Sequence, residues 1–322
     1  MSTANHVPET WELTGDDARE TLKRTGTRSL MKDGFKRFRV ADGFSHARSL
    51  AYLTTLIFLQ GIIALVGLAS AVSKGGVSDL IVRTMQTVVP GPASSALSDA
   101  VKQAHKAGSS HRYLALTLGL AAALITGTTL MGQIERALNR IYGIEQDRPP
   151  KKKYVHAFAL ALSAGVLIVA SFTALALGRA IGSSITNSSF ATIWSVLRWP
   201  VALIALVAAI ALMFRHAPKR HQPAWSWLAF GAGVSVALLA VVTLSLDLLF
   251  QLSSTFGKTY GPLASIVALM LWAVLASIAL LLGAAIAAQL EAVRAGATAP
   301  QDAQKVAESE PRQPSPATSL AG

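Results

Sequence analysis

The sequence predicts an all-α integral membrane protein with six transmembrane helices and a helical extracytoplasmic cap between spans one and two. Six apolar stretches carry this prediction, because about 20 helical residues, rising about 1.5 Å each, cross the roughly 30 Å hydrocarbon layer of a bilayer. They are residues 50–72, 113–131, 155–178, 199–214, 227–246 and 263–288. The composition agrees, since 52% of the residues are hydrophobic and 14% are charged, against about 25% charged in soluble domains.

The first 48 residues form a basic segment that we expect on the cytoplasmic side. Met31, Phe35 and Phe38 have helical spacing among many cations. Two interpretations stay open: a short helix on the inner leaflet, or a solvated basic segment. The first apolar run begins near residue 50, too far from the N-terminus for a cleavable signal peptide.

The membrane domain extends over residues 49–291 and contains one long outside loop, residues 73–112. Two amphipathic segments of this loop, residues 77–88 and 93–107, are separated by Pro90-Gly91-Pro92. Because proline interrupts a helix, this pattern predicts a helical hairpin. Residues 292–322 are rich in Ala, Gln, Glu, Pro and Ser, which predicts a disordered cytoplasmic tail.

The distribution of positive charge predicts the orientation. Of the 29 Lys and Arg residues, 21 fall in the N-terminal segment, the 132–154 and 215–226 loops and the tail. Cationic loops are retained in the cytoplasm, so both termini are expected there. The net charge of +12 is then a topology signal and a contact with anionic headgroups rather than a nucleic-acid site.

A few residues inside the spans stand out. Trp272 lies well inside span six, where we expect helix packing, and Gly231 and Gly233 open span five, where small residues allow close helix contact. Gln60 lies near mid-membrane and either bonds a neighbouring helix or lines a cavity. The span centres contain no Asp, Glu, Lys or Arg, which argues against a proton or sodium relay.

Two polar clusters are expected at the membrane surfaces. The outer cluster is Asp247, Arg179, Arg198 and Tyr260. The inner cluster is Glu135, Asn139, Arg140, Lys151, Lys152, Arg215 and Lys219. The alternative is that each residue is simply an interfacial anchor.

Enzymatic chemistry is not indicated, and we expect no cofactor or metal. None of the seven histidines has a metal-ligand spacing with a nearby carboxylate, and there is no cysteine. A phosphate-binding glycine loop and a Gly-Xaa-Ser-Xaa-Gly motif are also absent.

Three segments together resemble the YihY/BrkB family of six-span bacterial membrane proteins. They are ALNRIYGIEQDRP at 137–149, MFRHAPKRH at 213–221 and TYGPLASIVALMLWAVLASIALLLGAAIAAQLE at 259–291. A weaker match is Asp42 with Leu50-Ala51-Tyr52-Leu53. The sequence departs from the family in span one, where FLQG with Gln60 replaces a proline.

The resemblance implies a multi-pass protein of the bacterial plasma membrane with a role in envelope integrity. The family was once labelled ribonuclease BN, a label that the residues here do not support. Our leading hypothesis is a protein that handles or translocates lipid-like amphipathic molecules, with membrane lipids as partners and anionic headgroups bound on the cytoplasmic side. A small-solute exporter and a non-transporting scaffold for envelope machinery stay open, as does the oligomeric state.

Overall fold

The computed structural model describes residues 2–12, 16–72, 112–184, 188–252, 263–297 and 299–302. The regular secondary structure in these ranges is helical, apart from one isolated β-bridge. Two short helices, α1 (Asp16–Thr25) and α2 (Thr27–Val40), precede six long ones. The long helices are α3 (Gly43–Val72), α6 (Arg112–Tyr142), α7 (Pro150–Ser184), α8 (Ser188–His216), α9 (Trp225–Leu252) and α11 (Leu263–Arg294). The predicted cap lies outside the described residues except for Arg112, and so does the tail beyond residue 302.

Each predicted span lies within one of the long helices. Four segments of the described residues are long and apolar enough to cross a membrane: Leu116–Tyr142, Trp199–His216, Trp225–Leu252 and Ile266–Arg294. The prediction of an all-helical membrane protein is therefore confirmed, whereas the count of six spans stays a prediction.

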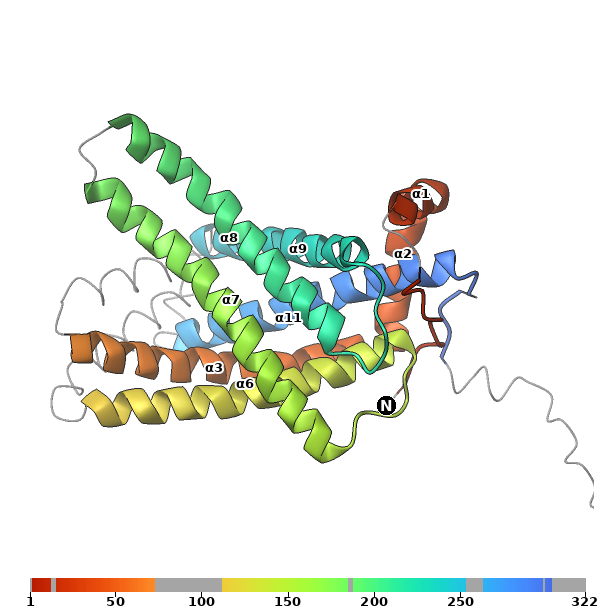
Figure 1. The fold of residues 1–322 in the computed structure, drawn as a ribbon, viewed down its shortest axis with the longest axis horizontal. Coiled ribbons are helices and arrows are strands. Elements are labelled where there is room, and N and C mark those ends of the chain that lie inside the picture. Colours follow the sequence, from red (N-terminus) through yellow and green to blue (C-terminus); the bar gives the residue numbers. More distant parts are fainter. Residues whose placement is uncertain are drawn as a thin grey trace, which may run out of the picture.

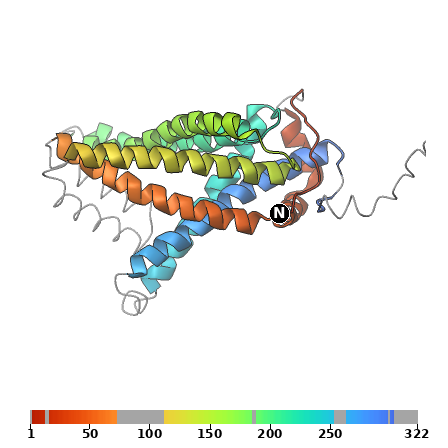
Figure 2. The same ribbon diagram turned by 90° about the horizontal axis from the view of Figure 1, so that it is seen from below.

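The long helices associate as three antiparallel pairs, α3 with α6, α7 with α8 and α9 with α11 (Figure 1). The pairs come together where α6, α8 and α11 end, and they separate toward their opposite ends (Figures 1 and 2). We call the first of these the network end. The largest core cluster lies there and includes Leu138, Ile141, Phe214, Ala284 and Ala288.

Toward the other end, many large apolar side chains are exposed. Leu252 of α9 is 78% exposed, and Val166 of α7 and Ile204 of α8 are 60% and 68% exposed. Exposed apolar faces on long helices suit contact with lipid, since lipid tails are as apolar as the side chains themselves.

Small residues allow α9 and α11 to approach closely. A Cβ atom on Gly283 would lie 2.0 Å from Ser235 Oγ, and one on Gly231 would lie 2.6 Å from Ala287 Cβ. A Cβ on Gly233 would contact nothing within 4 Å. The predicted close packing is confirmed for Gly231 and does not hold for Gly233, which is on another face of the helix.

A second core cluster joins α3, α9 and α11. Trp272 of α11 is 7% exposed and packs edge-on against Phe58, with the ring centroids 5.4 Å apart. Its indole N–H donates to Thr243 Oγ1 at 3.1 Å. Trp272 is thus a packing residue, as the sequence predicts.

The N-terminal segment before α1 lies across the network end. Ala4 N–H donates to Arg140 O at 3.1 Å, and Asn5 N–H donates to Gln301 O at 2.9 Å. Ala4 and Asp302 form the isolated β-bridge. Residues 301 and 302, which the sequence places in the tail, therefore pair with the start of the chain.

Gly143 ends α6 and makes room for this segment. Its φ of 79° lies in the left-handed region that favours glycine. A Cβ atom at this position would also lie 2.4 Å from His6 Cα. Any larger residue would therefore both strain the turn and displace the N-terminal segment.

Candidate functional site: the polar network at the network end

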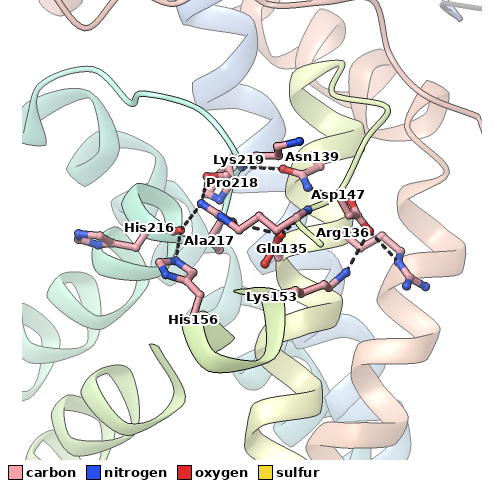
Figure 3. A network of polar contacts seen from close by, with 11 residues as sticks. Glu135, Arg136, Asn139, Asp147, Lys153, His156, His216, Ala217, Pro218 and Lys219 are labelled. Atoms are coloured by element: carbon pink, nitrogen blue, oxygen red, sulfur yellow. Dashed lines mark hydrogen bonds and ion pairs between the residues drawn. The ribbon is translucent and has the colours of Figure 1, made fainter. Parts of the chain in front are cut away.

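The connection between α6 and α7 is held by Asp147 (Figure 3). Its carboxylate accepts hydrogen bonds from Asn139 Nδ2 at 2.9 Å, Lys153 Nζ at 3.0 Å and Arg136 Nε at 3.3 Å. Burial by itself acts to raise the pKa of Asp147, but the bonds from Asn139 and Lys153, with the charges of Lys153 and Arg140, outweigh it. They lower the pKa to about 2, so Asp147 is ionised at neutral pH.

Arg148 joins this connection to the one between α8 and α9. Its guanidinium forms an ion pair with Glu135 of α6, Nη1 to Oε1 at 3.2 Å, and Glu135 is 1% exposed. The same guanidinium donates to Ala217 O at 2.7 Å and Pro218 O at 2.9 Å. In the same region Lys219 N–H donates to Asn139 Oδ1 at 2.9 Å (Figure 3). The two connections are therefore cross-linked by charge-assisted hydrogen bonds, which are stronger than neutral ones.

A second ion pair ties the α8–α9 connection to the end of α11. Arg220 Nη2 lies 2.6 Å from Glu291 Oε1, and the two side chains are only 3% and 2% exposed. Thr10 Oγ1 donates to the same carboxylate oxygen at 2.6 Å. The Arg220 guanidinium also lies over the Tyr142 ring, 4.6 Å from its centroid, a cation–π contact.

Arg37 of α2 is fully buried and connects four segments. Its Nε donates to Gln289 Oε1 at 2.8 Å, and its Nη1 donates to both Asn5 O and Ile141 O at 3.1 Å. Burial lowers the pKa of Arg37 to about 10, so the side chain stays protonated at neutral pH. We use the name polar network for the set Arg37, Glu135, Arg136, Asn139, Asp147, Arg148, Lys153, Arg220, Gln289 and Glu291.

The predicted inner cluster is divided by the structure. Glu135 and Asn139 are central to the polar network, and Lys219 contributes its backbone N–H. Arg140 donates to Ile144 O at 2.7 Å and Glu145 O at 2.6 Å. Arg215 lies over the Trp225 ring, 4.6 Å from its centroid.

Lys151 and Lys152 are exposed in the first turn of α7. Like the side chain of Lys219, which is also exposed, they stay available to an external anion. Their role as a headgroup contact stays a prediction.

The predicted outer cluster is only partly described. Asp247 accepts a hydrogen bond from Gln251 Nε2, one turn along α9, at 2.6 Å. The side chains of Arg179 and Arg198, and all of Tyr260, lie outside the described residues. Gln60 is half-buried, and among the described residues its Oε1 has no hydrogen-bond partner.

Sequence reasoning missed several members of the polar network. Arg37 and Lys153 counted only as topology signals. Arg148 and Arg220 appeared in addition within the family motifs, and Asp147 appeared only within a family motif. The available signal for Arg37 was its place on the helix face that also carries Leu30, Gly34 and Phe38, a face that is buried in the structure.

Two hollows open on the surface near the network end. A pocket of about 350 Å³ beside the α8–α9 connection is lined by Trp11, Arg215, His216, Arg220, His221, Gln222, Pro223 and Ala224. A groove of about 460 Å³ between α3 and α6 is lined by Arg48, Ser49, Tyr52, Leu53, Thr129 and Gln133. Across the ranges that the structure describes, no three His, Asp or Glu residues are grouped so that they could hold a metal ion.

Comparison with known proteins gives a consistent result. A family profile described as virulence factor BrkB matches residues 34–308. The chain is 25% identical over 269 residues to a Bacillus subtilis protein named as ribonuclease-like, YfkH, with 81% of this chain and 95% of that protein covered.

Two further relatives are named as membrane proteins. The chain is 26% identical over 279 residues to a UPF0761 membrane protein of Methylibium petroleiphilum and 28% identical over 252 residues to one of Rhodospirillum rubrum. These matches cover 84% and 76% of this chain but only 64% and 54% of the longer relatives. No solved structure is significantly similar to the chain.

Proposed function

The chain belongs to the virulence factor BrkB family, and on that premise we propose that it is a multi-pass protein of the bacterial plasma membrane that binds and translocates lipid-like amphipathic molecules. Two relatives are named as membrane proteins. Such a protein would serve envelope integrity by adjusting the lipids of the membrane that contains it.

The proposed topology has six spans with both termini in the cytoplasm. It is supported by six helices of 28 to 35 residues, each containing one apolar run. The network end carries the exposed cations Lys151 and Lys152, and loops rich in Lys and Arg are retained on the cytoplasmic side. The network end is therefore assigned to the cytoplasmic surface.

The observation that carries the proposed function is the groove between α3 and α6. Its open side is polar near the network end, where Arg48 and Gln133 line it. One to three turns further along the same helix faces, the exposed side chains become apolar, with Leu59 of α3 at 44% and Ile125 of α6 at 70% exposure. Tyr52, which is 60% exposed, lies between these two regions.

This order of side chains matches the order of groups in a phospholipid. A headgroup phosphate at Arg48 would gain a charge-assisted hydrogen bond, while the acyl chains would lie against Leu59 and Ile125 without leaving an apolar environment. Within the described residues Arg48 has no ion pair or hydrogen bond to another side chain, so its guanidinium is available. The groove is thus suited to an amphipathic molecule that enters sideways from the bilayer.

Lipid translocation in proteoliposomes tests this function. Purified full-length protein is reconstituted with headgroup-labelled phosphatidylglycerol, and a membrane-impermeant reagent then destroys the label in the outer leaflet. Translocation brings inner-leaflet lipid to the reagent, so the signal falls below the half that protein-free vesicles retain. A trace that matches protein-free vesicles for phosphatidylglycerol, phosphatidylethanolamine and phosphatidylcholine would refute the proposal.

A matched pair of variants examines the role of the groove. Arg48→Gln removes the cation that lines it, and we expect a translocation rate about fivefold lower, the effect of one cation near an anionic headgroup. Lys23→Gln removes an exposed cation of α1 that lies outside the groove and outside the predicted inner cluster, and it should change the rate less than twofold. Equal effects of the two substitutions would contradict a role for the groove.

A non-transporting scaffold is the second candidate, and the closed polar network favours it. The buried side chains of Arg220 and Glu291 pair with each other, and the buried Arg37 binds Gln289, so these charges do not face solvent. This is expected where the network serves stability alone. The small-solute exporter stays open as a third candidate, since among the described residues Gln60 Oε1 has no hydrogen-bond partner.

A further inference from the structure

Helix α2 has one face that is packed against the bundle. Leu30, Gly34, Arg37 and Phe38 are buried, and a Cβ atom on Gly34 would lie 2.7 Å from Ile286 of α11. At 3.6 residues per turn, or about 100° per residue, these four side chains fall within roughly one third of the helix circumference. Most side chains on the remaining two thirds are exposed.

The strip of α2 next to this buried face is apolar and exposed. Met31 and Phe35 are 40% and 43% exposed, and Phe44 at the start of α3 is 44% exposed. The three phenylalanines form one aromatic group, since the ring of Phe44 lies 4.9 Å from that of Phe38 and 6.4 Å from that of Phe35. Exposed large apolar groups that are gathered into a patch mark an interaction surface.

The next strip around α2 is basic. Arg28, Lys32, Lys36 and Arg39 are all exposed, and none of the four forms an ion pair with another residue that the structure describes. Ser29 lies beyond the basic strip, about 120° around the helix from Phe35. The sequence of faces is therefore buried, apolar, basic and polar, the pattern of a helix that lies in a membrane surface.

The placement of α2 agrees with this pattern. The helix runs across the direction of α11 (Figure 1), so it lies roughly along the membrane surface if α11 spans the bilayer. Gly43, where α3 begins, precedes the apolar run at Leu50 by seven residues, a rise of about 10 Å. That distance brings the phenylalanine side chains to the level of the headgroups.

We propose that α2 and the start of α3 form a peripheral anchor on the cytoplasmic leaflet, in which Met31, Phe35 and Phe44 enter the headgroup layer and the basic strip binds anionic phospholipids. The complementary charge identifies the partner, since cytoplasmic leaflets rich in anionic lipid attract juxtamembrane cations. The anchor does not depend on lipid translocation. It would fix the position of the network end relative to the bilayer surface.

Fluorescence quenching at single positions tests the anchor, because the chain contains no cysteine. Phe35→Cys and Ser29→Cys are made in the full-length protein, labelled with an environment-sensitive fluorophore and reconstituted in vesicles of phosphatidylglycerol and phosphatidylcholine. Both positions are exposed, so neither substitution removes core packing. Lipid carrying a nitroxide near the headgroup quenches a probe in the membrane surface, and acrylamide quenches a probe in water.

We expect the probe at position 35 to be quenched at least threefold more than the probe at position 29 by the nitroxide lipid, with the reverse order for acrylamide. Replacing phosphatidylglycerol by phosphatidylcholine should lower the nitroxide quenching at position 35, as should the double substitution Lys32→Gln and Lys36→Gln. Equal quenching at the two positions would overturn the anchor. A position 35 signal that is independent of anionic lipid and of both lysines would overturn its charge recognition.

Discussion

Removing the negative charge of Glu291 should destabilise the protein strongly. The Arg220–Glu291 pair is almost completely buried, with its N and O atoms 2.6 Å apart. At that distance Coulomb's law gives roughly 6 kcal/mol with an effective dielectric constant of about 20, most of which offsets the cost of removing both charges from water. Glu291→Gln keeps the shape but leaves Arg220 buried without a counter-charge, so we expect a loss of about 3–5 kcal/mol in the free energy of unfolding.

Equilibrium unfolding in mixed micelles, followed by circular dichroism, measures this loss. The matched control is Glu20→Gln, which breaks the exposed Arg24–Glu20 pair, whose side chains are 77% and 59% exposed; it should cost less than about 0.5 kcal/mol. The double variant Arg220→Met with Glu291→Met should recover at least half of the loss, because no buried charge remains. A Glu291→Gln protein within 1 kcal/mol of the unchanged protein would refute the reasoning.

Three further predictions concern pH, helix packing and topology. The pKa of Asp147 is lowered from 3.8 to about 2, so its contribution of about 2 kcal/mol to the free energy of unfolding is present above pH 4 and is lost as the pH falls toward 2. The free energy of unfolding, measured at a series of acidic pH values, should fall over this range, and Asp147→Asn should remove that decrease. Gly283→Ala should lower the free energy of unfolding by more than about 2 kcal/mol, because the added methyl group clashes with α9. Gly233→Ala has open space around it and should be neutral or stabilising by up to about 1 kcal/mol. Thermal unfolding in detergent compares the two variants. A single cysteine in place of Lys151 should react with an impermeant maleimide only after the cells are permeabilised, whereas one in place of Asp247 should react in intact spheroplasts. The opposite pattern would invert the proposed topology.

The apolar runs located the long helices well but not their ends. Predicted span two stops at Met131, four residues before the first charged residue, Glu135, whereas α6 continues to Tyr142. Helix propagation adds a hydrogen bond per residue and tolerates Glu, Arg and Asn, so hydropathy marks the membrane-crossing part rather than the end of the helix. The last three turns of α6 supply Glu135 and Asn139 to the polar network.

The polar network itself could not be assembled from the sequence. Glu291 and Arg220 are 71 residues apart along the chain, and Arg37 and Gln289 are 252 apart. A count of charges treats every Lys and Arg as a cation in water, so it cannot separate the buried Arg37 from the exposed Lys36. Lys151 and Lys152 are exposed in the structure, in agreement with the default preference of lysine for water, and their role in the inner cluster stays a prediction.

The contact between the two ends of the described chain has a consequence for synthesis in the cell. Asn5 is translated long before its backbone partner Gln301, which lies beyond α11. Arg37 and Arg220 likewise wait for Gln289 and Glu291 of α11. These arginines must therefore wait for their partners, and the network end can close only after α11 has been translated. A nascent chain that stalls before α11 keeps its N-terminal segment undocked, which leaves that segment open to proteases until the final helix arrives.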